Sequence, residues 1–138
     1  MNQMSELHDS ELAIIWVDYG AAIIIFSHLY IHKSEGELGR DPGSGWSQRA
    51  ELVIGDAPEI DFPRAWPCAI YDGSLELDGR VYDNEIPIPL AHRGSVRLKL
   101  DIADGDDNVR SLEIVGQSAH LTLLGEAHYV EELRAHVE

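Results

Sequence analysis

Two histidines are the first residues whose type and spacing suggest chemistry. His28 and His32 lie four positions apart, in and just after an apolar segment, 21–31. If that segment is an extended strand, both imidazoles point to one side but sit roughly 13 Å apart along it. A single metal ion holds its nitrogen ligands at about 2 Å, so it cannot bridge this pair. Metal binding would require one histidine to combine with a residue from another strand, and we predict neither a metal nor a cofactor.

The same side of this segment is a better candidate for binding. Alternation places Phe26 and Tyr30 beside the two histidines. Aromatic side chains with a few polar anchors are typical of shallow ligand grooves. The candidate contact residues here are therefore Phe26, His28, Tyr30 and His32. In the alternative, Phe26 belongs to a packed core layer and the other three reach solvent at the end of the strand.

A glycine-rich stretch, 32–48, follows directly. It contains four glycines and a proline, shows neither strand nor helix periodicity, and is longer than most loops in compact domains. Long loops often carry function, so Glu35, Arg40 and Trp46 are its candidate contact residues. Its glycines do not follow the order of a phosphate-binding loop. Trp46 is expected either to contact a partner or to fold back over the sheet, since tryptophan is usually buried.

No catalytic set of residues is evident. His8-Asp9-Ser10 contains the three residue types of a hydrolytic triad, but a triad is an arrangement in space that neighbours in sequence do not create. Hydrogen bonds from Asp9 or Ser10 to nearby backbone are the expected role. Cys68, beside Pro67, is expected in the core, since reactive cysteines need an electropositive setting. We therefore predict no catalytic residue.

Strands must position these residues, because alternation with period two dominates the chain. In 95–101, for example, apolar residues alternate with polar ones, which is typical of a half-buried strand. Such segments recur along the chain, separated by turn signals such as Asp78-Gly79. We predict one all-β domain over residues 1–138, an antiparallel β-sandwich or flattened barrel of about eight strands.

Two segments depart from the alternation. Pro87 and Pro89 cannot donate ladder hydrogen bonds, so 86–90 is expected to leave the sheet or to lie on its edge. In 126–137, valine and leucine residues recur at helical spacing. This pattern predicts one short C-terminal helix packed on the sheet.

The composition limits which kinds of partner and which cellular compartment are expected. Ten basic against 25 acidic residues leave a net charge of −15. That charge repels nucleic acid and anionic membrane surfaces and would attract a basic protein, although solubility alone also accounts for it. The single cysteine excludes an internal disulfide, and the first residues lack the basic and apolar runs of a signal peptide. A cytoplasmic location is therefore expected.

The His8-Asp9-Ser10 motif with Leu12, followed by a strand, a turn and a second strand, resembles the start of several families of small bacterial β-proteins of unknown function. Some of those proteins are immunity proteins encoded beside polymorphic toxins. The resemblance covers only the N-terminal strands and carries over no functional residue. It implies a binding protein without catalysis, whose acidity would suit a basic toxin domain.

We therefore expect a non-enzymatic binding or interaction module, with inhibition of a basic protein as one form of it. The 32–48 stretch and the side of the strand that bears His28 would form the contact surface. One alternative is a small-ligand-binding protein or a metal-assisted enzyme that uses His28 and His32. Another is a structural subunit whose apolar strands pair across a homodimer.

Overall fold

The computed structural model describes residues 2–38, 40–57, 59–63, 65–103, 105 and 108–134. Within these ranges all regular elements are β-strands, and their pairings are antiparallel. The eight strands are β1 (Asn2–Asp18), β2 (Ala21–Ser34), β3 (Gly43–Gly55), β4 (Cys68–Leu77), β5 (Arg80–Asp83), β6 (Glu85–Pro87), β7 (Ala91–Ala103) and β8 (Val109–Leu133). The all-β prediction is confirmed. The described ranges contain no helix with the length and apolar character needed to cross a membrane.

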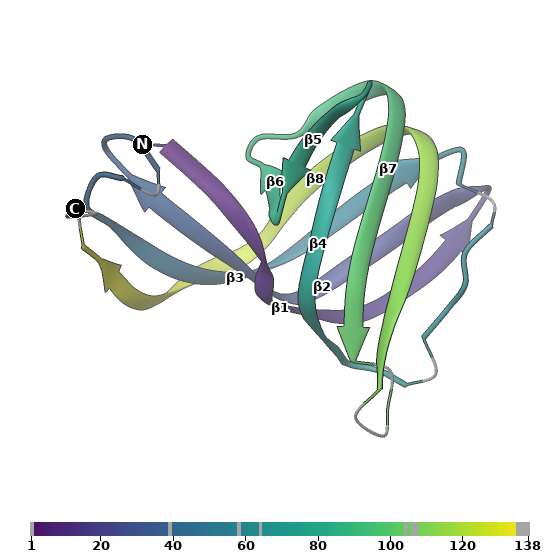
Figure 1. The fold of residues 1–138 in the computed structure, drawn as a ribbon, viewed down its shortest axis with the longest axis horizontal. Helices are drawn as coiled ribbons and strands as arrows, with labels where there is room; N and C mark the ends of the chain where they lie inside the picture. Colours follow the sequence, from purple (N-terminus) through teal and green to yellow (C-terminus); the bar gives the residue numbers. More distant parts are fainter. Residues whose placement is uncertain are drawn as a thin grey trace.

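Six of the strands close into a barrel. The hydrogen-bonded order is β5-β4-β7-β8-β3-β2-β1-β6, and an additional pairing joins β4 to β1, with Leu12 opposite Cys68. That short pairing converts an open sheet into the ring β1-β2-β3-β8-β7-β4 (Figure 1). The strands β5 and β6 extend the two ends of the sheet. The strand β6 lies at one end of the sheet and ends at Pro87, which confirms the prediction that 86–90 leaves the sheet or lies on its edge.

Four strands are longer than the barrel and continue out of it as an arm. The arm consists of 2–6 of β1, 29–34 of β2, 43–48 of β3 and 128–133 of β8. It projects to the left of the barrel in Figure 1, where the start of β1 and the end of β8 lie near its tip. The arm is therefore a continuation of the barrel sheet rather than a separate element.

All four strands carry an irregularity where they pass from the barrel into the arm. We call this region the neck. The irregularities are the register shifts Glu6/Glu11 in β1, Phe26/Leu29 in β2 and Ser47/Arg49 in β3, and the left-handed Gly125 in β8, with a φ of 69°. An extra residue in a strand reverses which of the following side chains face inward. The neck therefore changes the side on which alternate residues lie.

This reversal corrects the predicted faces of β2. Ile24 and Phe26 are fully buried inside the barrel, whereas Leu29 and Ile31 are fully buried in the arm. The expectation that Phe26 shares an open surface with Tyr30 is therefore wrong. Phe26 belongs to the core, which is the alternative that its sequence pattern left open.

The barrel interior follows the predicted alternation. Val96, Leu98 and Leu100 of β7 are at most 1% exposed, as expected for the inward side of a half-buried strand. The Asp78-Gly79 turn between β4 and β5 has positive φ at both residues, 49° and 86°. Two successive positive φ angles are the geometry of the tight hairpin predicted for this dipeptide.

The prediction of a C-terminal helix is wrong, because 126–133 continues β8. Its backbone pairs with β3, from Leu133 opposite Gly43 to His128 opposite Ser47. A lone helix of this length is marginal in water, whereas the neighbouring strand supplies ladder hydrogen bonds that local periodicity does not record. Residues 135–137 of the predicted helix lie outside the described residues.

The predicted 32–48 loop is also wrong in its bounds. The strands β2 and β3 take up both of its ends and leave a turn over 35–42. Its glycines permit close approach within the sheet, since a Cβ on Gly45 would overlap the Tyr30 hydroxyl. The glycines of this stretch are placed where neighbouring strands crowd together. Their number is the reason that the stretch resembled a loop in the sequence.

Candidate binding groove on the arm

Several concave surfaces lie on the arm, and one of them is lined by two of the predicted contact residues, His28 and Tyr30. We call it the Tyr30 groove. It is open to solvent and has a volume of about 430 Å³. It is lined by Asp9, His28, Tyr30, Ser47, Val130 and Glu131, which come from β1, β2, β3 and β8.

Tyr30 is the central residue of this groove and is only 9% exposed. Its side chain lies over Gly45 of β3, which has no side chain in its way. The hydroxyl reaches β8 and donates a hydrogen bond to the Glu131 carboxylate. His32 contacts the ring edge-on, with 5.1 Å between the ring centroids. One side chain thus spans three neighbouring strands.

Carboxylates surround the Tyr30 phenol. Burial raises the pKa of Tyr30 above its usual value near 10, and the hydrogen bond and charge of Glu131 raise it further. The charges of Glu6 and Asp9 act in the same direction. The phenol, which is neutral at physiological pH in any case, therefore keeps its proton to higher pH than an exposed tyrosine does. The same three carboxylates would stabilise a cation placed in the groove.

The two histidines on this side of β2 bind different partners. His32 Nε2 lies 2.7 Å from Glu6 Oε2 of β1, and His28 Nδ1 lies 2.9 Å from Ser47 Oγ of β3. The other oxygen of Glu6, Oε1, accepts from Asn84 Nδ2 at 3.4 Å. Among the described residues, no group of three potential metal ligands includes either histidine.

In the neck, Ser10 replaces ladder hydrogen bonds that the register shift removes. Its hydroxyl donates to the Glu6 carbonyl oxygen at 2.6 Å and accepts from the Tyr30 backbone N–H at 3.0 Å. Ser10 itself is 4% exposed. The predicted local role is therefore confirmed for Ser10, which fixes the backbone of Tyr30 at the base of the groove.

The candidate residues of the 32–48 stretch lie elsewhere. Glu35 and Arg40 are exposed in the 35–42 turn, and Arg40 Nη1 is 3.6 Å from Glu37 Oε2. Neither is among the residues that line the Tyr30 groove. The turn therefore does not complete that groove.

Trp46 lies on the opposite side of the arm from Tyr30. It pairs with Ile31, the next residue along β2, so its side chain points the other way. Its ring meets that of Tyr129 edge to face at 5.5 Å between centroids, and the Lys33 ammonium lies 4.6 Å from its centroid. Trp46 is partly buried against the core. The single contact surface predicted from the sequence therefore divides between two faces of the arm.

Sequence reasoning missed two carboxylates of the groove, Asp9 and Glu131. Glu131 is 101 positions away from Tyr30 in the chain and lies in the segment that was expected to be helical. Asp9 faces the groove because of the bend in β1, where its φ is 71°. The acidic composition was the only signal of such a site, and it does not assign residues.

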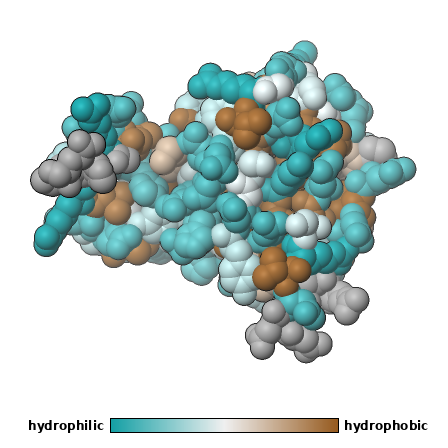
Figure 2. Space-filling view, viewed as in Figure 1, coloured by the Kyte–Doolittle hydropathy of each residue, from teal (hydrophilic) through white to brown (hydrophobic). Residues whose placement is uncertain are grey.

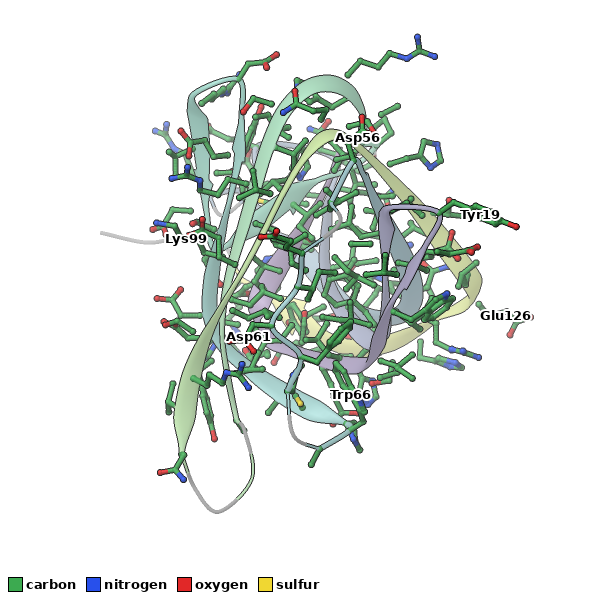
Figure 3. All side chains as sticks on the ribbon, turned by 90° about the vertical axis from the view of Figure 1, so that its right-hand side faces the viewer. Tyr19, Asp56, Asp61, Trp66, Lys99 and Glu126 are labelled. Atoms are coloured by element: carbon green, nitrogen blue, oxygen red, sulfur yellow. The ribbon has the colours of Figure 1, made fainter. Side chains whose placement is uncertain are left out.

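Another concave surface, of about 480 Å³, lies outside the barrel over β4, β5, β7 and β8. Lys99 is one of its lining residues, together with Asp72, Asp101 and Glu113. Figure 3 shows Lys99 on the outside of the barrel. Its ammonium offsets part of the local acidic charge, and none of the described lining residues is aromatic. This surface offers less to a cation than the Tyr30 groove does.

The outer faces of β1 and β2 carry an apolar patch. Ile14 lies opposite Ile25, and Trp16 lies opposite Ile23. Ile14 and Trp16 are 41% and 40% exposed. Tyr19, at the hairpin tip beside them, is fully exposed and points away from the barrel (Figure 3). A homodimer would use a surface of this kind, and that alternative stays a prediction.

Comparisons of the chain with protein families, with curated proteins and with solved structures found no match. The resemblance of the N-terminal motif to small bacterial β-proteins therefore stays a prediction. Function has to be argued from the site itself.

Proposed function

We propose that the protein is a non-enzymatic binding module that recognises a basic partner protein by taking a lysine or arginine side chain into the Tyr30 groove. The observation that carries this proposal is the convergence of Asp9 and Glu131 on a buried phenol, with Glu6 close behind. Among the described residues, those that line the groove include no lysine or arginine. A cation would therefore meet attraction from several sides.

The chemistry of the groove suits a cationic side chain. The aliphatic part of lysine or arginine can rest against Val130, which is 49% exposed. The charged end can reach Asp9 or Glu131, and charge-assisted hydrogen bonds to carboxylates are among the stronger kinds. Tyr30 holds Glu131 in place beforehand, which lowers the cost of ordering it on binding.

The net charge of the whole chain also favours a basic partner. A net charge of −15 steers basic proteins inward and repels phosphate backbones, so nucleic acid and anionic membranes are not the proposed partners. Figure 2 shows a largely hydrophilic surface over the region between the arm and the barrel. The inhibition of a basic protein, which the N-terminal resemblance implies, would use the same chemistry.

Binding is favoured over hydrolysis by the surroundings of His28. Its contact with Ser47 Oγ resembles a nucleophile next to a base. A catalytic base is normally oriented by a third group on its other nitrogen. The part of the chain that the structure describes shows no carboxylate in hydrogen-bond contact with the second nitrogen of His28. The pair therefore lacks the support that activates a serine.

The proposal is tested with a fluorescent oligo-arginine peptide and its citrulline analogue, which has the same shape without the charge. We expect the arginine peptide alone to bind, and its affinity to fall as salt is added. Glu131→Gln should weaken binding about 5-fold, as expected for the loss of an exposed ion pair worth ~1 kcal/mol.

Glu132→Gln is the matched control, since it removes the same charge from the next residue of β8, which lines a groove on the Trp46 face. We expect it to change the affinity less than about 2-fold, because long-range charge is screened. Equal losses in the two variants, or equal binding of the citrulline peptide, would overturn the proposal.

A further inference from the structure

A second set of side chains gathers in the neck, next to the groove but largely outside it. Glu6, His8 and Asp9 each offer one ligand atom, and these atoms lie within 4.8 Å of one another. This is the single group of three such side chains in the described ranges. Of the three, Asp9 alone lines the Tyr30 groove.

The bend of β1 creates this group. In a regular strand Glu6 and His8 share one side, whereas Asp9 points to the other. Between Glu6 and Glu11 the pairing with β2 is interrupted, and Asp9 adopts a left-handed φ of 71°. This conformation brings the Asp9 carboxylate to 3.3 Å from His8 Nδ1. The Asp9 carboxylate, which would point away from Glu6 and His8 in a regular strand, thus converges with them.

We infer that Glu6, His8 and Asp9 bind one divalent transition-metal ion of the zinc type, with water completing its coordination. One imidazole and two carboxylates form a mixed nitrogen and oxygen donor set. Imidazole suits zinc, copper, nickel and iron, whereas calcium and magnesium prefer oxygen ligands alone. An open, partly water-filled coordination sphere is typical of sites with three protein ligands.

Neighbouring elements hold the first of these ligands in position. Glu6 is contacted by His32 Nε2 on one oxygen and by Asn84 Nδ2 on the other. Asn84, between β5 and β6, also accepts from the His8 backbone N–H at 2.7 Å. Hydrogen bonds of this kind orient the ligands of metal sites before the ion arrives.

The site is accessible from solvent. The side chains of His8 and Asp9 are 55% and 60% exposed, whereas Glu6 is 26% exposed at the base. An ion could therefore enter without any rearrangement of the barrel. The inference does not rest on the proposed groove function, because Glu6 and His8 lie outside the Tyr30 groove and the two sites share only Asp9 among their lining residues.

The test is a titration of tag-free protein with Zn²⁺ in competition with a chromophoric chelator, repeated with Co²⁺ for its visible absorption. We expect one Zn²⁺ per chain, and we expect His8→Ala and Glu6→Gln each to weaken binding at least ~10-fold, because each removes or alters a ligand. His120→Ala is the matched control, because it removes an exposed imidazole from β8, and it should leave the affinity unchanged. Circular dichroism shows whether each variant keeps the β-sheet.

The inference is overturned if the wild-type protein does not compete with the chelator for Zn²⁺. It is also overturned if folded His8→Ala and His120→Ala proteins bind Zn²⁺ equally well, which would indicate scattered surface histidines. Loss of the oligo-arginine interaction with Zn²⁺ binding retained would refute the groove function alone.

Discussion

A methyl group added at Gly45 should displace Tyr30 from its position over β3. In Gly45→Ala the new Cβ would occupy space now taken by the Tyr30 hydroxyl and the adjoining ring carbon. The backbone of β3 is held on both sides by β2 and β8, so the tyrosine must move instead. Its hydrogen bond to Glu131 is then lost, and part of the ring is exposed to solvent.

The expected loss in the free energy of unfolding is the sum of three contributions. Exposing on the order of 80 Å² of ring surface costs about 2 kcal/mol at ~25 cal/mol per Å². Losing the hydrogen bond adds about 1 kcal/mol, and replacing glycine by alanine within a strand returns about 0.5–1 kcal/mol. The net loss in the free energy of unfolding is therefore about 2 kcal/mol, which lowers Tm by about 6–10 °C for a chain of this size.

Chemical denaturation followed by circular dichroism measures this loss, and a double-mutant cycle isolates its cause. In a Tyr30→Ala background the added methyl meets mainly the Glu131 side chain, which is exposed and can move. Gly45→Ala should then be neutral or slightly stabilising, so the coupling between the two positions should be about 2–3 kcal/mol. A cost of Gly45→Ala that is the same in both backgrounds would refute the packing of Tyr30 over Gly45.

Two further predictions concern the phenol and the core. Because the pKa of Tyr30 is raised, folded protein keeps this proton at pH values where the unfolded chain loses it, so the free energy of unfolding should fall as pH rises above about 10. Phenolate absorbance measured against pH in wild-type and Tyr30→Phe protein isolates the titration of Tyr30, because the variant lacks only this phenol. The difference between the two curves should appear only well above pH 10 or on unfolding. A difference centred at pH 10 would contradict the buried, carboxylate-bound phenol. Phe26→Ala should lower the free energy of unfolding by about 3–5 kcal/mol, since Phe26 is fully buried. Tyr19→Ala at the exposed hairpin tip should change it by less than ~0.5 kcal/mol, and similar losses in both variants in urea denaturation would show that Phe26 is not a core residue.

The parts of the fold that were predicted correctly depend on local rules. The Asp78-Gly79 hairpin follows from two residues that tolerate positive φ. The inward side of β7 follows from strict alternation, and the edge position of β6 follows from a proline that cannot donate a ladder hydrogen bond. Each of these inferences needs only a few neighbouring residues.

The candidate site was predicted only in part. His28 and Tyr30 do line one groove, as the alternation indicated, but Phe26 is separated from them by the register shift in β2. Trp46 lies on the other face, because it belongs to β3 rather than to a loop. A single irregular residue in a strand is enough to reverse such an assignment.

The amino-acid sequence by itself determined that this chain forms strands and tight turns, where its core residues would alternate, and that it carries a strong negative charge. Those properties follow from the spacing of apolar residues and from the residue types, and both can be read from a few neighbouring residues. Only the tertiary structure decided that the strands bend together at one neck and that the end of β8 pairs with β3 instead of forming a helix. It also decided that Glu131 meets Tyr30. The physical reason is that bulges and strand partners are selected by hydrogen bonds between distant segments, and those bonds exist only once the sheet has closed.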